Sequence, residues 1–220
     1  MKERCEYILF LNNRYDRRDN PFYLKSLRRK YVVAVDGGIR FFLKNKIYPD
    51  IMIGDFDSAP PLSEKYLMNF DVIRFPSAKD KTDSQLALEL ALARGVTDIE
   101  ICGALGNREV DHVLGNIFLL DLVNKFNENR HTKISARVIA PRETIYLANN
   151  SALNLAGKRG DYISIIPLSD GVMLDFDGLV YPPPRRPLEF GDSLTLRNEL
   201  KGGRCRIRIK GKAAVAMISK

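Results

Sequence analysis

Short apolar runs that end abruptly in polar or glycine-containing turns dominate the chain before Pro141. Runs of this length, partly β-branched, are typical of strands that are buried on both faces of a parallel sheet. Between them lie segments with helical spacing of apolar residues, as at Val113, Ile117 and Leu120. The alternation of strand and helix predicts a mainly parallel sheet with helices on both faces.

The expected strands of this part are Tyr7–Leu11, Tyr31–Val35, Ile51–Ile53, Asp71–Phe75, Asp98–Cys102 and Ile134–Ala140. Helices are expected from Pro21 to about Lys30, after Gly38, around Leu62–Met68, over Leu86–Leu92 and from about Asp111. Pro21 suits the first turn of a helix, and Gly95 suits the position just after one.

The pattern changes after Pro141. Short strand-like runs follow one another closely at Ile145–Leu147, Tyr162–Ile166, Val172–Phe176, Ser193–Leu196, Arg206–Ile209 and Ala213–Ile218. Glycine, asparagine, aspartate or proline separates them, and no long helical period is present, which indicates a small all-β sandwich. We therefore expect two domains. Residues 1–142 form a Rossmann-like three-layer α/β domain, and residues 143–220 form a β-sandwich domain.

Composition limits the kinds of site that the chain can contain and the compartment in which we expect it. The 220 residues include three cysteines, an odd number and widely spaced, and two histidines, so neither a disulfide framework nor a zinc site is indicated. The N-terminus lacks a signal-peptide pattern and no apolar run has membrane-spanning length, so we expect a cytoplasmic protein that does not enter a membrane. The net charge of +8 suits a polyanionic partner, although the basic residues are spread along the chain.

Acidic residues follow several of the predicted strands. Asp55 and Asp57 come directly after one strand, Asp80 and Asp83 lie in the polar segment after the next, and Asp111 follows a third. In a parallel sheet these loops lie at the same edge, where so many carboxylates would repel one another. Mg²⁺ and a polyphosphate between them would remove that repulsion.

Other readings of the same residues stay open. Asp83 and Asp111 also suit helix N-caps, and His112 suits a structural role or a ligand contact better than that of a general base. Neither a P-loop sequence GxxxxGKS/T nor the pattern GxGxxG occurs, so the usual nucleotide-binding motifs are unsupported. The basic residues Lys79, Lys81, Arg40 and Arg108 adjoin the acidic loops and are placed to hold phosphate oxygens.

Four segments together resemble one family. They are VDGG (35–38), PDIMIGDFDS (49–58), DKTDSQLAL (80–88) and GALGNREVDHVLGN (103–116), and their order and spacing are similar to those of thiamine pyrophosphokinases. The later segments IPL (166–168), GLVY (178–181) and NELKGG (198–203) resemble the thiamine-binding β domain of that family. The resemblance covers nearly the whole chain.

The resemblance implies transfer of a pyrophosphoryl group from ATP to the hydroxyl of thiamine, giving thiamine diphosphate and AMP. The catalytic acidic set would be Asp55, Asp57, Asp80, Asp83 and Asp111, of which the first four would hold Mg²⁺. ATP would be bound by Asp36, Gly37, Gly38, Arg40, Lys81, Thr82, Arg108, His112 and Asn116. Thiamine would be bound by Tyr181 and Asn198. The family also implies a homodimer whose active site is shared between subunits.

The chain departs from the family pattern at two positions. The family's Ser-Asn pair, which contacts thiamine, is Arg197-Asn198 here, so only the asparagine is carried over. The aromatic residue that packs on the thiamine ring is often tryptophan, whereas this chain has Tyr181 and no tryptophan. A tyrosine ring can still stack on a cationic heterocycle.

Three other functions compete with this reading. A related pyrophosphokinase that acts on a pterin alcohol would share the acidic loops, but the aromatic residue Tyr181 and Asn198 favour a cationic acceptor. A magnesium-dependent phosphatase with a DxD motif would leave the Asp80–Asp83 segment unexplained. An RNA-binding β domain would use the basic run Arg204–Lys212 and would explain none of the aspartates, so nucleic acid is disfavoured as a partner.

Overall fold

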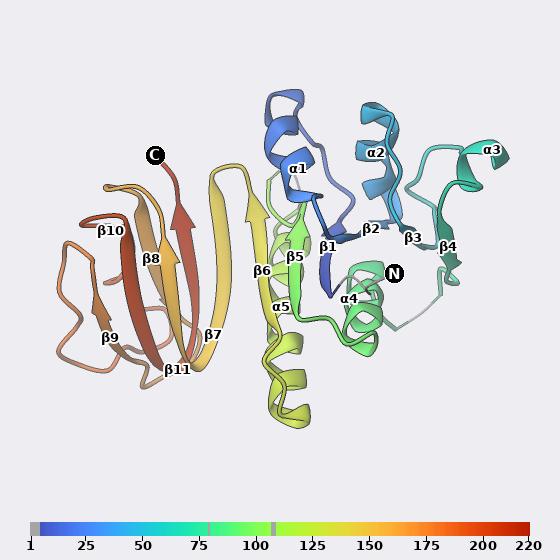
Figure 1. The fold of residues 1–220 in the computed structure, drawn as a ribbon. Coiled ribbons are helices and arrows are strands. Elements are labelled where there is room, and N and C mark those ends of the chain that lie inside the picture. Colours follow the sequence, from blue (N-terminus) through green and yellow to red (C-terminus); the bar gives the residue numbers. More distant parts are fainter. Residues whose placement is uncertain (1–4, 79, 107–108) are drawn as a thin grey trace. The chain divides into compact units, whose positions relative to one another are not determined.

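The chain is a mixed α/β protein that divides into two compact units, Met1–Pro141 and Arg142–Lys220. The computed structural model describes residues 5–78, 80–106 and 109–220 (Figure 1). Among these residues, no helix is both long enough and apolar enough to cross a lipid bilayer.

A parallel sheet forms the centre of the first unit. Its strands are β1 (Glu6–Phe10), β2 (Tyr31–Val35), β3 (Ile51–Gly54), β4 (Asp71–Arg74), β5 (Asp98–Cys102) and β6 (Ser135–Ala140). They lie in the order β6-β5-β1-β2-β3-β4, and every neighbouring pair is parallel. The direction of progression reverses between β1 and β5, and ligands of open α/β sheets bind beside such a reversal, at the carboxyl ends of the strands.

Helices cover both sides of this sheet (Figure 1). They are α1 (Asn20–Ser26), α2 (Ile39–Asn45), α3 (Glu64–Leu67), α4 (Asp83–Ala93) and α5 (Val110–Arg130), with 3₁₀ turns η1 (Arg17–Asp19) and η2 (Asp36–Gly38). In Figure 1, α1 and α2 lie on one side of the sheet and α4 and α5 on the other. The helix expected from Pro21 to about Lys30 already ends at Ser26, and Arg29 has a left-handed φ of 63°.

An aromatic cluster fills the side of the sheet that α1 and α2 cover. Successive strand residues point to opposite faces, so Ile8 and Phe10 of β1 lie on this side. Phe10 stacks on Phe41 with 4.7 Å between ring centroids, and Tyr15 meets Tyr23 edge-on at 5.0 Å. This packing fixes β1 and the start of α2, from which part of the candidate site projects.

The second unit is built from antiparallel strands. They are β7 (Glu143–Ala156), β8 (Tyr162–Pro167), β9 (Met173–Asp177), β10 (Asn198–Glu199) and β11 (Arg204–Ile218). β7 and β11 pair along almost their whole length, while β11 pairs on its other side first with β9 and then with β8. The change of partner coincides with a register shift between Ile209 and Lys212, where Gly211 has a φ of 100°. Such a bulge bends a strand and increases its twist.

Several strand predictions for the second unit need correction. The strand expected at Ser193–Leu196 is wrong, since this segment forms a turn. The runs Arg206–Ile209 and Ala213–Ile218 are parts of one strand, β11, and Ile145–Leu147 is only the start of β7. Polar residues and Gly211 interrupt the apolar pattern, but β11 continues past them because the ladder with β7 resumes after the bulge and pairing does not depend on the side chain.

Candidate active site

The acidic loops of the first unit meet at a cavity of about 520 Å³ at the carboxyl ends of the strands. Of the predicted site residues, Asp36, Asp55, Asp80, Lys81, Thr82, Asp83, His112 and Asn116 line it. Its lining also includes Leu11, Asn12, Val35, Ser58, Ser77 and Ser84, which were not among the predicted site residues. The cavity lies where the strand order reverses, as expected for a ligand site in an open sheet.

Asp36 is held in an uncommon conformation directly after β2. It has a φ of 47°, and only 8% of its surface is exposed. The two glycines that follow let the turn press against β1, since a Cβ on Gly38 would lie 2.0 Å from the carbonyl oxygen of Phe10. A left-handed aspartate costs conformational energy, which a site tolerates when the surroundings determine the geometry.

Burial changes the chemistry of this carboxylate. Desolvation raises the pKa of Asp36, with smaller opposing contributions from hydrogen bonds to the Gly37 amide and the Ser58 hydroxyl. Within the described part of the chain, its buried Oδ1 has no hydrogen-bond partner. An unpartnered buried oxygen of this kind is costly unless a ligand completes its surroundings.

The DFDS turn after β3 brings two more carboxylates to the same place. Phe56, between Asp55 and Asp57, has a φ of 69°, which is unusual for an aromatic residue. Its ring is held by the Arg74 guanidinium, 4.8 Å from the ring centroid. The Asp57 amide donates a hydrogen bond to Asp55 Oδ1 at 3.2 Å, so the turn folds back on itself.

Asp36, Asp55 and Asp57 form one group. Each offers a carboxylate oxygen, and these oxygens all lie within 4.8 Å of one another. Oxygen donors of this kind are what Mg²⁺ prefers, and among the residues that the structure describes none occupies Asp36 Oδ1, whose lone pairs remain available to a cation. The residues therefore fit a divalent cation. Asp36, expected as part of the nucleotide pocket, lies within this acidic group.

The start of α4 forms the second wall of the cavity. Thr82 is the N-cap of the helix, and its hydroxyl accepts a hydrogen bond from the Gln85 amide at 3.2 Å. This cap places Asp83 in the first turn, where a carboxylate is favoured by the helix dipole. Lys81 lines the cavity and also pairs with Glu89, with 2.8 Å between Nζ and Oε2.

The first turns of α5 supply the third wall. His112 and Asn116 line the cavity, whereas Asp111 does not. Asp111 lies beside His112, whose amide donates to Asp111 Oδ1 at 2.7 Å, and these two residues form a second exposed group with Glu109. The predicted phosphate contacts Lys79 and Arg108 lie outside the described residues.

The most informative residue absent from the prediction is Asn12, directly after β1. Its Nδ2 lies 3.5 Å from Asp36 Oδ2, and its Oδ1 accepts a hydrogen bond from Arg40 Nη1 at 3.2 Å. Arg40 is thus anchored to the site through Asn12, although it does not line the cavity itself. Gly37 is buried against the same asparagine. The available signal was a polar residue at a strand exit, the same signal that indicated Asp36 and Asp55.

The predicted thiamine contacts lie in the second unit and differ sharply in exposure. The Tyr181 residue is 64% exposed, whereas Asn198 is 6% exposed. The carboxamide of Asn198 bonds to backbone groups of Tyr181 and Glu199. Tyr181 is therefore available to a ligand, while Asn198 is largely enclosed by its own unit.

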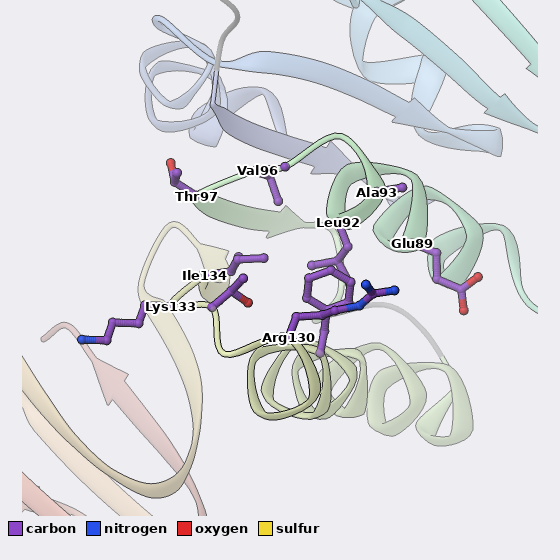
Figure 2. Close-up of a pocket in the computed structure, with 11 residues that line it drawn as sticks. Glu89, Leu92, Ala93, Val96, Thr97, Arg130, Lys133 and Ile134 are labelled. Carbon is purple, nitrogen blue, oxygen red and sulfur yellow. The ribbon is translucent and has the colours of Figure 1, made fainter.

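A larger cavity of about 1030 Å³ lies elsewhere in the first unit (Figure 2). Its lining includes the apolar side chains of Leu92, Val96 and Ile134, with Glu89 and Arg130 at the side. These residues come from the ends of α4 and α5 and from the loops before β5 and β6. This is the amino end of the parallel strands, opposite the edge where the acidic loops gather, so its size alone does not make it the active site.

Comparison with known proteins identifies relatives over much of the chain. A family model described as "Thiamin pyrophosphokinase, catalytic domain" matches residues 25–133. A thiamine pyrophosphokinase of Bacillus subtilis (strain 168) is 32% identical over 174 residues, which are 76% of this chain and 77% of that protein.

Solved structures agree with this match. The crystal structure of thiamine pyrophosphokinase from Bacillus subtilis superposes with a TM-score of 0.82 at 28% identity, covering 98% of this chain and 99% of that one. Thiamin pyrophosphokinase from Candida albicans has a TM-score of 0.79 at 17% identity, covering 99% and 90% of the two chains, and shows that the fold is shared.

Proposed function

Because this chain belongs to the thiamine pyrophosphokinase family of ATP-dependent pyrophosphoryl transferases, we propose that it transfers the pyrophosphoryl group of ATP to the hydroxyl of thiamine. The products are thiamine diphosphate and AMP. The observation that carries the proposal is the group of Asp36, Asp55 and Asp57, whose oxygens lie within 4.8 Å of one another beside a cavity of about 520 Å³.

The acidic residues are assigned to magnesium binding. Asp55 and Asp57 hold the ion, Asp36 completes the group on the buried side, and Asp80 and Asp83 approach from the α4 side of the same cavity. When bound, Mg²⁺ neutralises the charge of the triphosphate and of the departing phosphate. The strained Phe56 keeps the two carboxylates of the DFDS turn in place before the substrate arrives.

ATP is assigned to the same cavity. Its lining includes His112 and Asn116 of α5 and, at the start of α4, Lys81 and Thr82. Arg40 is connected to the cavity through its hydrogen bond to Asn12. Gly37 and Gly38 act through the backbone, by allowing the close approach of the turn to β1. Arg108 is assigned to the phosphates from the sequence alone, by its place beside the acidic loops and by the resemblance of its segment.

Catalysis rests on positioning an in-line attack on the β-phosphorus. The acceptor hydroxyl loses its proton as the new oxygen–phosphorus bond forms and the bond to the α-phosphate oxygen breaks. Asp83 or Asp111, each in the first turn of its helix, accepts this proton. The exposed ring of Tyr181 supplies a stacking surface for the cationic ring of thiamine.

The two units are proposed to have different functions, catalysis and thiamine binding. We assign residues 1–142 as a Rossmann-like three-layer catalytic domain and residues 143–220 as a β-sandwich domain that binds thiamine. We also propose a cytoplasmic homodimer in which the two subunits share each active site, as the family resemblance implies.

Product identification tests the proposal. The protein is incubated with ATP, Mg²⁺ and thiamine, and in parallel with a pterin alcohol, and the nucleotides are separated by chromatography. We expect AMP and thiamine diphosphate in equal amounts, formed only with thiamine. ADP with thiamine monophosphate, turnover of the pterin alone, or phosphate release without any acceptor would each contradict the proposal.

A further inference from the structure

The segment that carries Tyr181 runs beside the segment that contains Asn198. The Lys201 amide donates to the Gly178 carbonyl at 2.9 Å, and the Val180 amide donates to the Glu199 carbonyl at 2.9 Å. An isolated antiparallel bridge between Leu179 and Leu200 lies between these two bonds. The backbone ladder thus leads up to Tyr181.

A side chain continues the ladder at Tyr181. Asn198 Oδ1 accepts from the Tyr181 amide at 3.0 Å, and Asn198 Nδ2 donates to the Tyr181 carbonyl at 3.1 Å. The same Oδ1 also accepts from the Glu199 amide at 2.9 Å. Both amides need an acceptor, which fixes the orientation of the carboxamide. One enclosed side chain therefore holds both backbone polar groups of Tyr181.

The chain on the other side of Tyr181 is also constrained. Residues 182–184 are prolines, and a residue before proline is restricted to extended conformations. Tyr181 is thus held between the Asn198 carboxamide and a stiff proline run, while most of its surface is exposed. A ring carried by a fixed backbone loses little conformational entropy when a ligand stacks on it.

We propose that Asn198 is a positioning residue, which sets the place of Tyr181 for the acceptor and does not itself contact it. This inference rests on the proposed function for the identity of the acceptor, and on the hydrogen bonds alone for the link between the two residues. It changes the expectation from the family resemblance, in which the asparagine touches thiamine directly.

The absence of tryptophan from the chain gives a direct test of the link. A Tyr181→Trp variant has a single tryptophan, whose fluorescence anisotropy reports the freedom of that side chain. Adding Asn198→Ala should lower the anisotropy in the absence of any substrate. The matched control is Thr195→Val, because Thr195 is also buried and its hydroxyl donates to the Ile165 carbonyl at 2.6 Å and not to Tyr181. The control should leave the anisotropy unchanged.

Steady-state kinetics test the consequence for catalysis, on variants made in the wild-type chain and not in Tyr181→Trp. Asn198→Ala should raise the KM for thiamine about 5- to 10-fold, as expected for lost hydrogen bonds, with kcat and the KM for ATP almost unchanged. If Asn198 acts through Tyr181, the double variant Asn198→Ala with Tyr181→Ala should have the KM of Tyr181→Ala alone. Multiplied effects in the double variant would indicate direct contact and would overturn the proposal.

The conservative variant and the fold are checked in the same series. Asn198→Asp keeps an acceptor for the Tyr181 and Glu199 amides but sets a second carboxylate oxygen against the Tyr181 carbonyl, so its KM for thiamine should also be raised. Unchanged anisotropy in Asn198→Ala, or loss of folding in both Asn198 variants, would overturn the positioning role. Failure of the wild-type chain to use thiamine would instead contradict the proposed function, because the anisotropy measurement needs no substrate.

Discussion

At the scale of single residues, Asp36 differs from the other carboxylates of the site. It is almost fully enclosed, its backbone is left-handed, and no other residue in the described ranges hydrogen-bonds to its Oδ1. Asp55 and Asp57 complete the same group from a turn that itself contains a strained residue, Phe56. Strain and unsatisfied polar atoms gather where function requires them, at a cost to stability.

Asp36→Asn should raise the stability of the protein and lower its activity. A neutral amide of the same size is cheaper to bury than a carboxylate, so without added metal the free energy of unfolding should rise by about 1 kcal/mol. Turnover should fall at least about tenfold, because a charged group facing the metal is lost. Urea denaturation and steady-state kinetics measure the two effects. A parallel loss of stability and activity would indicate that Asp36 only supports the fold.

Asp55→Asn and Asp57→Asn should each lower turnover by about 100-fold or more while the protein stays folded, since each removes a charged ligand of the proposed Mg²⁺. Asp71→Asn is the matched control, because Asp71 is an exposed aspartate at the start of β4. Circular dichroism checks the fold, and rates are measured over a range of Mg²⁺ concentrations. Activity close to wild type in either DFDS variant would contradict the metal assignment.

At the scale of elements, an ion network joins β5, β6 and the loop after α1. Glu100 of β5 is 7% exposed and pairs with Lys30 and, at 2.5 Å, with Arg137 of β6. Arg137 also pairs with Asp98 at 2.7 Å. Burying these charges is costly, but each of them has a partner, so the network fixes how the β6 edge of the parallel sheet is assembled.

Removing the centre of this network should be strongly destabilising. Glu100→Gln leaves two enclosed cations with less compensation, and we expect the free energy of unfolding to fall by about 3 kcal/mol. Asp98→Asn should have a smaller effect, because Asp98 is more exposed and Arg137 keeps its contact with Glu100. Denaturant titrations of both variants give the comparison. Equal losses of unfolding free energy in the two variants would show that the burial of Glu100 does not determine the size of the destabilisation.

At the scale of the whole molecule, stability depends on pH through a partly buried tyrosine, Tyr66. Burial raises the pKa of Tyr66 from 10.0 to about 12, with a smaller contribution from Tyr48. The Tyr66 hydroxyl donates to the Ile47 carbonyl at 3.1 Å. Below pH 10 this tyrosine is neutral in both the folded and the unfolded chain. Between pH 10 and 12 it ionises only in the unfolded chain.

Tyr66 should therefore contribute to alkaline unfolding. Its contribution to stability is complete below pH 10 and is lost as the pH rises towards 12. Tyr66→Phe removes this group, so the difference in unfolding free energy between wild type and variant should shrink over that range. Paired denaturant titrations from pH 8 to 12 measure it. A constant difference at all these pH values would contradict the raised pKa.

The sequence by itself determined most elements of the first unit and the edge of its sheet at which the acidic loops gather. Buried parallel strands need apolar runs, so β1 to β6 were predicted close to their observed positions. Carboxyl ends of parallel strands share one edge, so Asp55, Asp80 and Asp83 were expected together, and all three line one cavity. These inferences depend on local pattern and on one general property of parallel sheets.

Only the tertiary structure decided which further residues join the acidic loops and how the strands of the second unit pair, because both depend on contacts between residues far apart in the chain. Asn12 meets Asp36 across 24 positions, and Asn198 holds Tyr181 across 17. No local pattern showed that Asp36 joins the group of Asp55 and Asp57, or that Asn198 is turned inward. In the same way, the two predicted runs of β11 belong to one strand because each pairs with β7, and backbone pairing with a distant strand cannot be read from the local pattern of side chains.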